Sequence, residues 1–308
     1  MTEDNNRPLV SICSLAYNHA PYIRQCLESF LMQKSNFKYE IIIHDDASTD
    51  GTAEIIKEYA DKYPDLIKPI YQKENQYSKG VRGIFARFVF PKAKGKYIAM
   101  CEGDDYWTDP FKLQKQVDFL EKNPGYSMCF HFYDKYLQNK GCFDGVEPYE
   151  MNGNFSFGLD FYVGLKWVTR TLTVLYRKSA LDYQHYMSYD YQIDAVLFYC
   201  LLKNGEGFLM PDNMGVYRVH DGGVWSRSSW LQGFTYNLKV FKSIYDVNKD
   251  EVSAKLIKNW LHINGYLDFT FFKNNLFLYI KCLCAILKNV GIRGFLSVLY
   301  RNLNFFKR

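Results

Sequence analysis

The sequence predicts an α/β fold, with a mostly parallel central sheet flanked by helices and a helical C-terminal extension. Short apolar runs alternate with amphipathic stretches through the first half of the 308-residue chain. Alternating strands and helices are typical of a parallel sheet that helices cover on both faces. Beyond Trp225 the apolar spacing indicates helices alone.

The first half is expected to hold four strands, each a short apolar run. These strands are expected at residues 9–16, 40–44, 67–72 and 97–101. Helices are expected between and after them, at residues 21–32, at residues 52–63 with Thr52 as the cap, and from Asp109 onward. The last helix has a clear start signal, because Asp109 can accept hydrogen bonds from free N–H groups and Pro110 fits the first helical position.

The second half has a mixed pattern from about residue 126. Strands are expected at residues 127–133, 173–176 and 215–220, and a strongly apolar helix at residues 193–203. We therefore expect one large domain over residues 1–228 and a helical, basic and apolar extension over residues 229–308.

The composition argues against several classes of protein. A net charge of +5 is too small to indicate a nucleic-acid partner, and we expect none. The eight cysteines include no C-x-x-C pair and no Cys/His metal spacing, so we expect neither a zinc site nor a disulfide scaffold. The polar first residues, MTEDNNRP, lack the apolar run of a signal peptide, which makes the cytoplasm the expected location.

The C-terminal region has an asymmetric charge. No acidic residue follows Asp268, whereas seven basic residues do: Lys273, Lys281, Lys288, Arg293, Arg301, Lys307 and Arg308. The longest apolar stretch, residues 276–287, is too short for a spanning helix, which needs about 20 apolar residues. Two interpretations stay open. The helix could lie on an anionic membrane surface, peripherally on its inner face, or pack on the protein with its Lys side chains reaching solvent.

The strongest chemical signal is an acidic cluster at the end of the fourth expected strand. Glu102, Asp104 and Asp105 follow an apolar run, and a helix is expected shortly afterwards. Three carboxylates at this spacing repel one another unless a cation offsets them. Mg²⁺ and Mn²⁺ prefer such oxygen ligands, completed by phosphate oxygens. The alternative is a solvated acidic turn.

Two further polar clusters follow expected strands. Asp45 and Asp46 end the second strand, and Ala16-Tyr17-Asn18 ends the first. Ligands bind at the carboxyl ends of the strands in such sheets. There an acidic residue can accept hydrogen bonds from a base or ribose, and an aromatic ring can lie over a base. Local turn and capping roles are the alternative for each cluster.

A fourth cluster follows the last expected strand. His220 could complete a metal shell or contact a phosphate, and Arg218 could also contact a phosphate. Trp225 and Ser226 lie just beyond a glycine pair and are further candidates for substrate contact. A structural role for a lone histidine stays open.

Motifs of several other enzyme classes are absent from the sequence. It contains no G-x-G-x-x-G, G-x-x-x-x-G-K-[ST], G-x-S-x-G or H-E-x-x-H, which argues against dehydrogenases, P-loop NTPases, serine hydrolases and zinc proteases. The loop after the first strand, residues 16–21, has neither Gly nor Lys or Arg, which argues against a nucleotidyltransferase.

In order and context, these clusters resemble the family 2 glycosyltransferases, which have the GT-A fold. The run from Val10 to Asn18 looks like the family's first strand and base-binding loop. The run from Glu40 to Thr52 is similar to its second strand with paired Asp residues. Glu102-Gly103-Asp104-Asp105 occupies the place of the D-x-D motif, with Glu in place of the first Asp. The resemblance extends over roughly residues 8–228.

The resemblance implies a role for each matching residue. The residues it implies for nucleotide binding are Ala16, Tyr17, Asn18, Asp45, Asp46, Glu102, Gly103 and Asp104. Those it implies for the metal are Asp104, Asp105 and His220, and the substrate or phosphate contacts are Arg218, Trp225 and Ser226. The family's catalytic base is an acidic residue at the start of a helix. Asp194 fits its spacing to the downstream Gly207-Phe208-Leu209 better, and Asp190 is the reserve.

The implied activity is inverting transfer of a sugar from a nucleotide diphosphate sugar, UDP-linked, to a hydroxyl acceptor. The donor half is expected at about residues 1–125 and the acceptor half at about residues 126–228. The cofactor would be Mn²⁺ or Mg²⁺, and the acceptor a glycan or lipid-linked glycan in surface polysaccharide synthesis. The alternative is a non-catalytic sugar-nucleotide-binding or scaffold protein on the same fold.

Overall fold

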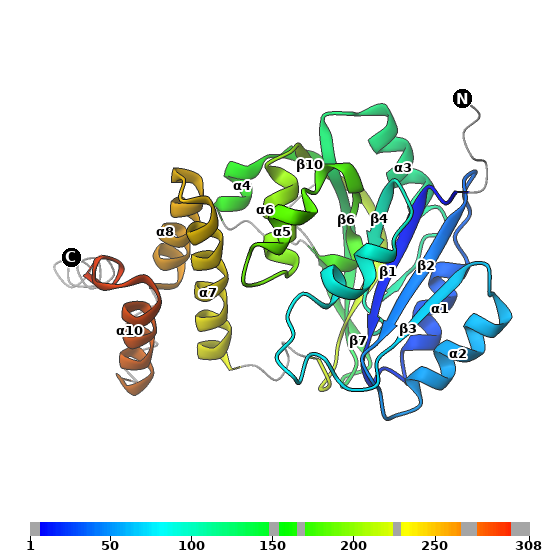
Figure 1. The fold of residues 1–308 in the computed structure, drawn as a ribbon, viewed down its shortest axis with the longest axis horizontal. Coiled ribbons are helices and arrows are strands. Elements are labelled where there is room, and N and C mark those ends of the chain that lie inside the picture. The colour runs from blue at the N-terminus through cyan, green and yellow to red at the C-terminus, as the bar shows by residue number, and fades with distance from the viewer. Residues whose placement is uncertain (1–6, 148–153, 165–169, 224–228, 266–275, 297–308) are drawn as a thin grey trace. The chain divides into compact units, whose positions relative to one another are not determined.

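The computed structural model describes residues 7–147, 154–164, 170–223, 229–265 and 276–296 (Figure 1). The chain forms two compact units. The first unit consists of Met1–Leu159, Trp167–Met187 and Gln192–Gly222, and the second of Asp160–Lys166, Ser188–Tyr191 and Gly223–Arg308. The expected domain boundary at residue 228 lies outside the described residues.

The first unit is built on one mixed sheet with the strand order β3-β2-β1-β4-β9-β6-β10-β5. Its first four strands in the chain are parallel and run side by side (Figure 1). They are β1 (Val10–Ala16), β2 (Tyr39–Asp45), β3 (Ile67–Tyr71) and β4 (Tyr97–Met100). The predicted mostly parallel sheet with flanking helices is confirmed.

The other half of the sheet mixes directions. The strand β9 (Leu175–Arg177) is antiparallel to both β4 and β6 (Tyr126–Leu137). The long strand β10 (Glu206–Val219) is parallel to β6 and antiparallel to the short strand β5 (Tyr106–Trp107). Two strands lie off this path: β7 (Cys142–Glu147) pairs with β6, and β8 (Phe155–Phe157) pairs with β10.

The helices of this unit follow their apolar spacing. They are α1 (Ile23–Leu31), α2 (Thr52–Lys62), α3 (Lys112–Lys122), α5 (Tyr183–Met187) and α6 (Asp194–Leu202). Single turns occur at Phe85–Val89, Phe90–Lys92, Thr171–Thr173 and Lys178–Ala180. All residues of α6 after Asp194 are buried, as its continuous apolar run predicts.

The core lies between the sheet and the helices. Ile12 and Ile43 of the sheet pack with Leu27 and Phe30 of α1 and with Leu113 of α3, and all five are fully buried. Burying each such side chain contributes about 1.5–3 kcal/mol. The core therefore holds the strand ends rigidly in register.

Three local expectations were wrong. Gly51, with φ of 99°, precedes α2, and Thr52 is the first helical residue, so Thr52 is not the cap. The helix expected from Asp109 begins at Lys112 instead, because Asp109 accepts a hydrogen bond from the N–H of Phe111 in a preceding turn. The strand expected from Thr173 begins at Leu175, because Thr173 belongs to a 3₁₀ turn.

The second unit is helical in its described residues, as expected beyond Trp225. It contains α7 (Trp230–Asn248), α8 (Glu251–Gly265) and α10 (Leu276–Val290), and most of the short helix α4 (Leu159–Val163). Ser229 caps α7 in a capping box with Gln232. Among the described helices, none combines the length and hydropathy needed to cross a membrane.

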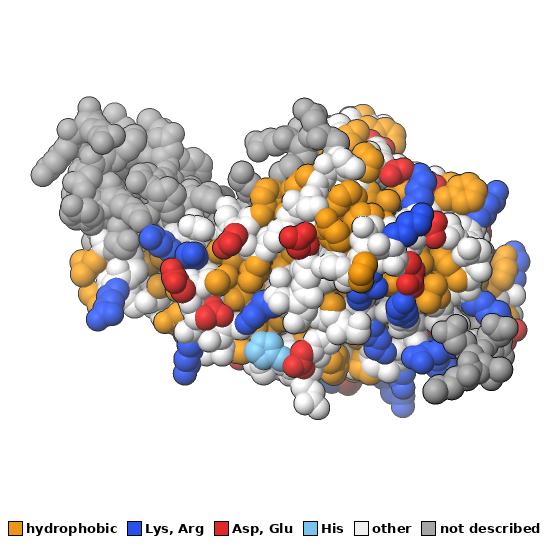
Figure 2. All heavy atoms as spheres, turned by 90° about the horizontal axis from the view of Figure 1, so that it is seen from above, with side chains coloured by type: hydrophobic (Ala, Val, Ile, Leu, Met, Phe, Trp, Pro, Cys, Tyr) orange, Lys and Arg blue, Asp and Glu red, His pale blue; other side chains and the backbone are white. Residues whose placement is uncertain are grey.

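The surface has mixed charge. Figure 2 shows that basic and acidic side chains of the described residues are interspersed on the face it displays, with hydrophobic side chains between them. Interspersed charges of both signs are typical of well-solvated protein surfaces.

Candidate functional site

The carboxyl ends of three parallel strands meet at one edge of the sheet. Ala16 at the end of β1 pairs with Asp45 at the end of β2, and Cys13 of β1 pairs with Met100 at the end of β4. Parallel pairing continues past β4, since the N–H of Gly103 donates to the carbonyl of Leu15 at 2.8 Å. The three polar clusters singled out in the sequence therefore lie together, at the edge where such sheets bind ligands.

The acidic loop after β4 has its three carboxylates in different surroundings. Glu102 is half-buried and accepts a hydrogen bond of 2.5 Å from the hydroxyl of Thr171. Burial raises the pKa of Glu102 to about 7, although the bond from Thr171 lowers it. Burial also raises the pKa of Asp105 well above its usual range. Burial acts to raise the pKa of Asp104, but the hydrogen bond with His220 and the charges of His19 and His220 together lower it.

Pairing between β5 and β10 brings the fourth cluster to the acidic loop. Because Val216 pairs with Tyr106, the residues after Val216 pass beside the residues before Tyr106. His220 Nε2 lies 3.0 Å from Asp104 Oδ2, and the N–H of Arg218 donates to Asp105 Oδ1 at 2.8 Å. Residues more than 100 positions apart in the chain thus form one site.

The Arg218 side chain holds the acidic loop in shape. Its Nε donates to the carbonyl of Asp104 at 2.8 Å, and its two Nη atoms donate to Gln138 and Gln25 at 2.6 and 2.7 Å. A guanidinium has five N–H groups, so two remain for the predicted phosphate contact. Only 8% of Arg218 is exposed, which limits the directions from which a phosphate can approach.

A residue that the sequence reasoning missed, His19, completes the cluster. His19 Nε2 lies 3.6 Å from Asp104 Oδ2, and one ligand atom each from His19, Asp104 and His220 lie within 4.8 Å of one another. Burial lowers the pKa of His19, against the charge of Asp104. The signal in the sequence was its position directly after Tyr17-Asn18. Thr171, the partner of Glu102, carried no such signal.

The loop after β1 presents an aromatic ring at this edge. Tyr17 is 45% exposed, as the predicted contact with a base requires. Asn18 adopts a φ of 54°, and its side-chain oxygen accepts a hydrogen bond of 2.9 Å from the N–H of Thr49. The N–H of Asn18 donates to the hydroxyl of Ser48 at 2.9 Å. Asn18 thereby joins the loops that follow β1 and β2.

The paired Asp residues after β2 differ in their partners. Both carboxylate oxygens of Asp46 accept backbone hydrogen bonds, from the N–H groups of Gln76 and Tyr77 at 2.8 and 3.0 Å. Asp45 accepts one bond of 3.1 Å from the N–H of Ser48 through Oδ2. Its Oδ1 is buried and has no partner among the described residues. Of the two residues, only Asp45 has a carboxylate oxygen without a hydrogen-bond partner among the described residues.

The two candidates for the catalytic base lie in different units. Asp194 begins α6, and its Oδ1 accepts a hydrogen bond of 2.8 Å from the N–H of Ala195. The side chain keeps solvent access, but surrounding protein atoms raise its pKa. Its charge also raises the pKa of Glu102, so the two carboxylates interact electrostatically. Asp190 belongs to the second unit, where its N–H donates to Ser243.

Two predicted residues, Trp225 and Ser226, lie outside the described residues. Gly103 lies within the described residues, and the absence of a side chain there affects how closely its neighbours can pack. A Cβ atom there would lie 2.9 Å from Ile23 Cδ1 and 3.0 Å from His19 Nδ1. Glycine therefore allows the acidic loop to approach α1 and His19 closely.

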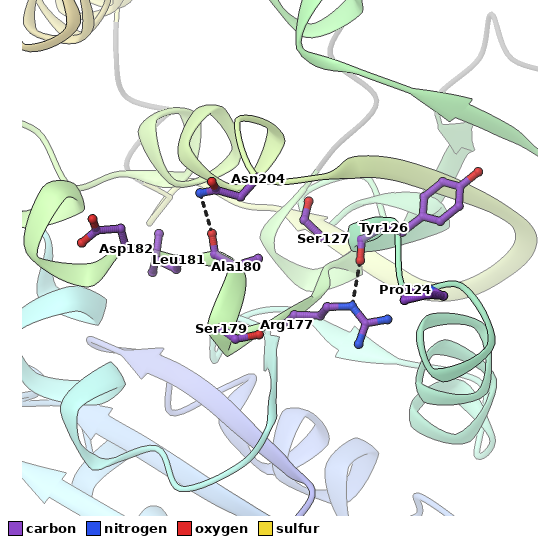
Figure 3. Close-up of a pocket in the computed structure, with 9 residues that line it drawn as sticks. All are labelled: Pro124, Tyr126, Ser127, Arg177, Ser179, Ala180, Leu181, Asp182 and Asn204. Carbon is purple, nitrogen blue, oxygen red and sulfur yellow. Dashed lines mark hydrogen bonds between the residues drawn. The ribbon is translucent and has the colours of Figure 1, made fainter.

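A separate hollow of about 360 Å³ lies at the opposite edge of the sheet (Figure 3). Tyr126, the first residue of β6, and Arg177, which pairs with Tyr97 at the start of β4, line it. The Arg177 Nε donates a hydrogen bond of 2.8 Å to the carbonyl of Tyr126, and this bond joins two residues of the hollow's lining. None of the predicted site residues lines this hollow.

Comparison with known proteins places these features in a family. The chain matches the model of glycosyl transferase family 2 over residues 11–183. An uncharacterised protein of Mycobacterium tuberculosis is 38% identical over 218 residues, 70% of this chain and 60% of that protein. A UDP-Glc:α-D-GlcNAc-diphosphoundecaprenol β-1,3-glucosyltransferase of Escherichia coli is 38% identical over 147 residues, 47% of this chain and 53% of that enzyme. The chain thus spans 60% or less of the length of these two curated relatives.

Solved structures show the same fold at low sequence identity. Residues 1–349 of TarS from S. aureus, in complex with UDP-GlcNAc, match with a TM-score of 0.66 and 18% identity, over 90% of this chain and 79% of that one. A mannosyltransferase from Pyrobaculum calidifontis, in complex with GDP-Man and Mn²⁺, matches with a TM-score of 0.59 and 17% identity, over 98% and 81% of the two chains.

The family model covers more than half of the chain, from β1 to the start of α5. That region includes the acidic loop and the polar ends of β1 and β2. This chain therefore belongs to glycosyltransferase family 2 and has the GT-A fold.

Proposed function

We propose that the protein is an inverting, metal-dependent glycosyltransferase that moves a sugar from a UDP-linked donor to a hydroxyl acceptor in surface or lipid-linked polysaccharide synthesis. The observation that carries this proposal is the meeting of Asp104, Asp105 and His220 at the carboxyl edge of the sheet. One compared enzyme is named for UDP-Glc and the compared TarS structure is a complex with UDP-GlcNAc, which supports the donor class.

The donor diphosphate and its cation would bind at the acidic loop. Asp104, Asp105 and His220 would hold Mn²⁺ or Mg²⁺, and their oxygen and imidazole groups suit a divalent ion. The bound ion would offset negative charge on the departing nucleoside diphosphate. Burial raises the pKa of Glu102 and of Asp105, and the neighbouring carboxylates raise both further. A cation relieves such crowding of carboxylates.

The nucleoside would bind at the ends of β1 and β2. Asp45 has a buried oxygen without a partner, which can accept a hydrogen bond from a base N–H. Tyr17 follows the neighbouring strand β1, and the face of its exposed ring can stack on the base. Ala16, Asn18, Asp46 and Gly103 would shape this pocket through the backbone and loop contacts described above.

Asp194 would act as the catalytic base. It would take the proton from the acceptor hydroxyl while the acceptor oxygen attacks the anomeric carbon and the diphosphate leaves. A carboxylate with a raised pKa holds the abstracted proton better than an ordinary one. Asp190 remains the reserve candidate.

The acceptor would be held near a membrane. On α10 and just after it, Leu287, Ile292 and Leu296 are exposed beside Lys288 and Arg293. Exposed apolar groups next to basic ones suit an anionic lipid surface. Charge reversal at Lys288 and Arg293 should weaken sedimentation with anionic vesicles, and unchanged sedimentation would rule this surface out as the anchor.

The competing function is sugar-nucleotide binding without transfer. One experiment separates the two. Purified protein is mixed with Mn²⁺ or Mg²⁺ and a panel of nucleotide sugars, and both thermal stabilisation and slow release of nucleoside diphosphate are recorded. We expect metal-dependent stabilisation and release with one UDP-sugar, both lost in Asp104→Ala but kept in Asp118→Ala on the exposed face of α3. Stabilisation without release, even with added acceptor, would favour the binding protein.

A further inference from the structure

We propose that His19 is an additional ligand of the bound cation, so that two imidazoles hold the ion together with the carboxylates and favour Mn²⁺ over Mg²⁺. This inference rests on the proposed function, because it concerns the same site. It assigns a metal-binding role to a residue of the loop that otherwise serves the nucleoside.

The geometry brings both imidazoles to one carboxylate. His220 Nε2 and His19 Nε2 lie 3.0 and 3.6 Å from the same oxygen, Asp104 Oδ2. The two rings are nearly perpendicular, at 84°, with centroids 6.1 Å apart. Ligand atoms about 2.1 Å from an ion lie about 3–4 Å from one another. Three candidate atoms within 4.8 Å need only a small inward movement to reach that arrangement.

The backbone already holds His19 in place. Its N–H donates to the hydroxyl of Thr52 at 2.8 Å, and its carbonyl accepts from the N–H groups of Tyr22 and Ile23, both at 2.8 Å. The missing side chain of Gly103 leaves the room that the imidazole occupies. A preorganised ligand loses little entropy when the ion binds.

The His19 side chain has an unmet hydrogen-bonding capacity. Its Nδ1 is buried and has no partner among the described residues, whereas a structural histidine in a protein interior is normally bonded. His220 differs, because its Nδ1 accepts a hydrogen bond of 3.2 Å from the N–H of Gly222. The protein's own side chains therefore hold the His19 ring only loosely, with Nδ1 unpartnered and Nε2 facing Asp104, which fits a ring that serves as a ligand rather than as a structural contact.

The ligand set determines which ion is favoured. Imidazole nitrogen suits transition metals, whereas Mg²⁺ prefers oxygen ligands alone and keeps much of its water. A second imidazole in the ligand set therefore shifts the preference toward Mn²⁺. Because His19 follows Tyr17-Asn18 directly, ion binding would also order the nucleoside loop, so Mn²⁺ and UDP should strengthen each other's binding.

The test measures the bound ion itself. The full-length protein is titrated with MnCl₂, with and without UDP, and binding is followed by the loss of the free Mn²⁺ signal in electron paramagnetic resonance. Pulsed measurements then count ¹⁴N nuclei of coordinated imidazoles. We expect two imidazoles in the unmodified protein and one in His19→Gln, with Mn²⁺ affinity reduced at least about tenfold. His185→Gln, on α5, is the matched control and should keep both.

A second variant protects the test against a folding defect. In His19→Asp the carboxylate restores an ion ligand, so Mn²⁺ affinity should recover while the ratio of Mn²⁺ to Mg²⁺ affinity falls. A single imidazole in the unmodified protein, or an unchanged spectrum in His19→Gln, would overturn the inference and leave the proposed function standing on Asp104, Asp105 and His220. No Mn²⁺ binding to the unmodified protein, with or without UDP, would overturn both.

Discussion

The amino and carboxyl edges of the sheet differ in how completely their buried polar side chains are hydrogen-bonded. At the amino edge, Arg177 donates to Tyr97 and to the carbonyls of Leu120, Tyr126 and Asn123. Glu40 there accepts from the hydroxyl of Ser11 and the N–H of Lys94, both at 2.7 Å.

At the carboxyl edge, Asp46 and Arg218 have such partners, but two other buried polar atoms do not. Asp45 Oδ1 and His19 Nδ1 have none among the described residues, and burial and neighbouring charge hold the pKa of Glu102 at about 7. A protein normally satisfies its buried polar groups, so the unsatisfied ones mark the place where a ligand completes the structure. Loss of a side chain should therefore reduce stability at the amino edge and function at the carboxyl edge.

The largest effect is expected at Asp194. Asp194→Asn removes the proposed proton acceptor, and general-base catalysis contributes about 10² to 10⁴ in rate. Turnover with donor and acceptor should fall by that factor, while donor affinity, measured by calorimetry, changes little. Asp190→Asn is the paired variant and should keep most activity. If Asp190→Asn is the inactive one, the two roles must be exchanged.

A large loss of stability is expected at the amino edge. Arg177→Met leaves several carbonyls without their donor, and an unpaired buried acceptor costs about 1–3 kcal/mol. The free energy of unfolding should therefore fall by about 2–3 kcal/mol, which urea titration measures as a lower midpoint. The ratio kcat/KM of the protein that remains folded should stay unchanged. A selective loss of turnover would show that the hollow beside Arg177 takes part in function.

The paired Asp residues after β2 offer a closer comparison. Asp45→Asn removes the charge at the unpartnered oxygen, and UDP affinity should fall about tenfold, or about 1.4 kcal/mol. Asp46→Asn removes one of two acceptors for the N–H groups of Gln76 and Tyr77, so it should lower the melting temperature instead. Calorimetric titration with UDP checks the first result and a thermal melt the second. Equal losses of UDP affinity would mean that both side chains serve the nucleotide.

The smallest effect is a change in pH dependence. The pKa of Glu102 is about 7 in the folded protein against 4.5 ordinarily, so the unfolded chain loses its proton first as pH rises. The stability that Glu102 contributes is complete below pH 4.5 and is lost as pH rises through 7. Glu102→Gln keeps an acceptor for Thr171 and removes the titration. Between pH 4.5 and 8 the variant should become steadily more stable relative to the parent, in urea titrations with EDTA. Asp118→Asn is the control, and a parallel pH profile for Glu102→Gln would contradict the prediction.

Much of the fold could be predicted because its signals are local. The β-branched run Glu40–His44 and the apolar spacing of residues 113–120 indicate a strand and a helix without reference to distant residues. Errors arose where a neighbour decided the geometry. Thr52 could cap a helix by its chemistry, but its hydroxyl instead donates to Asp50 and accepts from the N–H of His19. Thr173 reads as strand, but a 3₁₀ turn that begins at Thr171 includes it.

The order of strands and helices along the chain is enough to place the polar clusters at one edge of the sheet. Strand and helix alternate, so the strands are parallel, and parallel strands end on the same side. Asp45, Asp104 and the ring of Tyr17 could therefore be assigned together.

Which atoms meet at that edge depends on contacts between distant parts of the chain. The pairing of β5 with β10 brings His220 to Asp104. The Arg218 side chain donates a hydrogen bond to the carbonyl of Asp104 and so holds the acidic loop in place. The absence of a side chain at Gly103 leaves space for the His19 ring. Contacts across 85 to 116 positions, as between His19 or His220 and Asp104, depend on strand order and register. Local propensity carries no information about these, because register is set by the packing of the whole sheet.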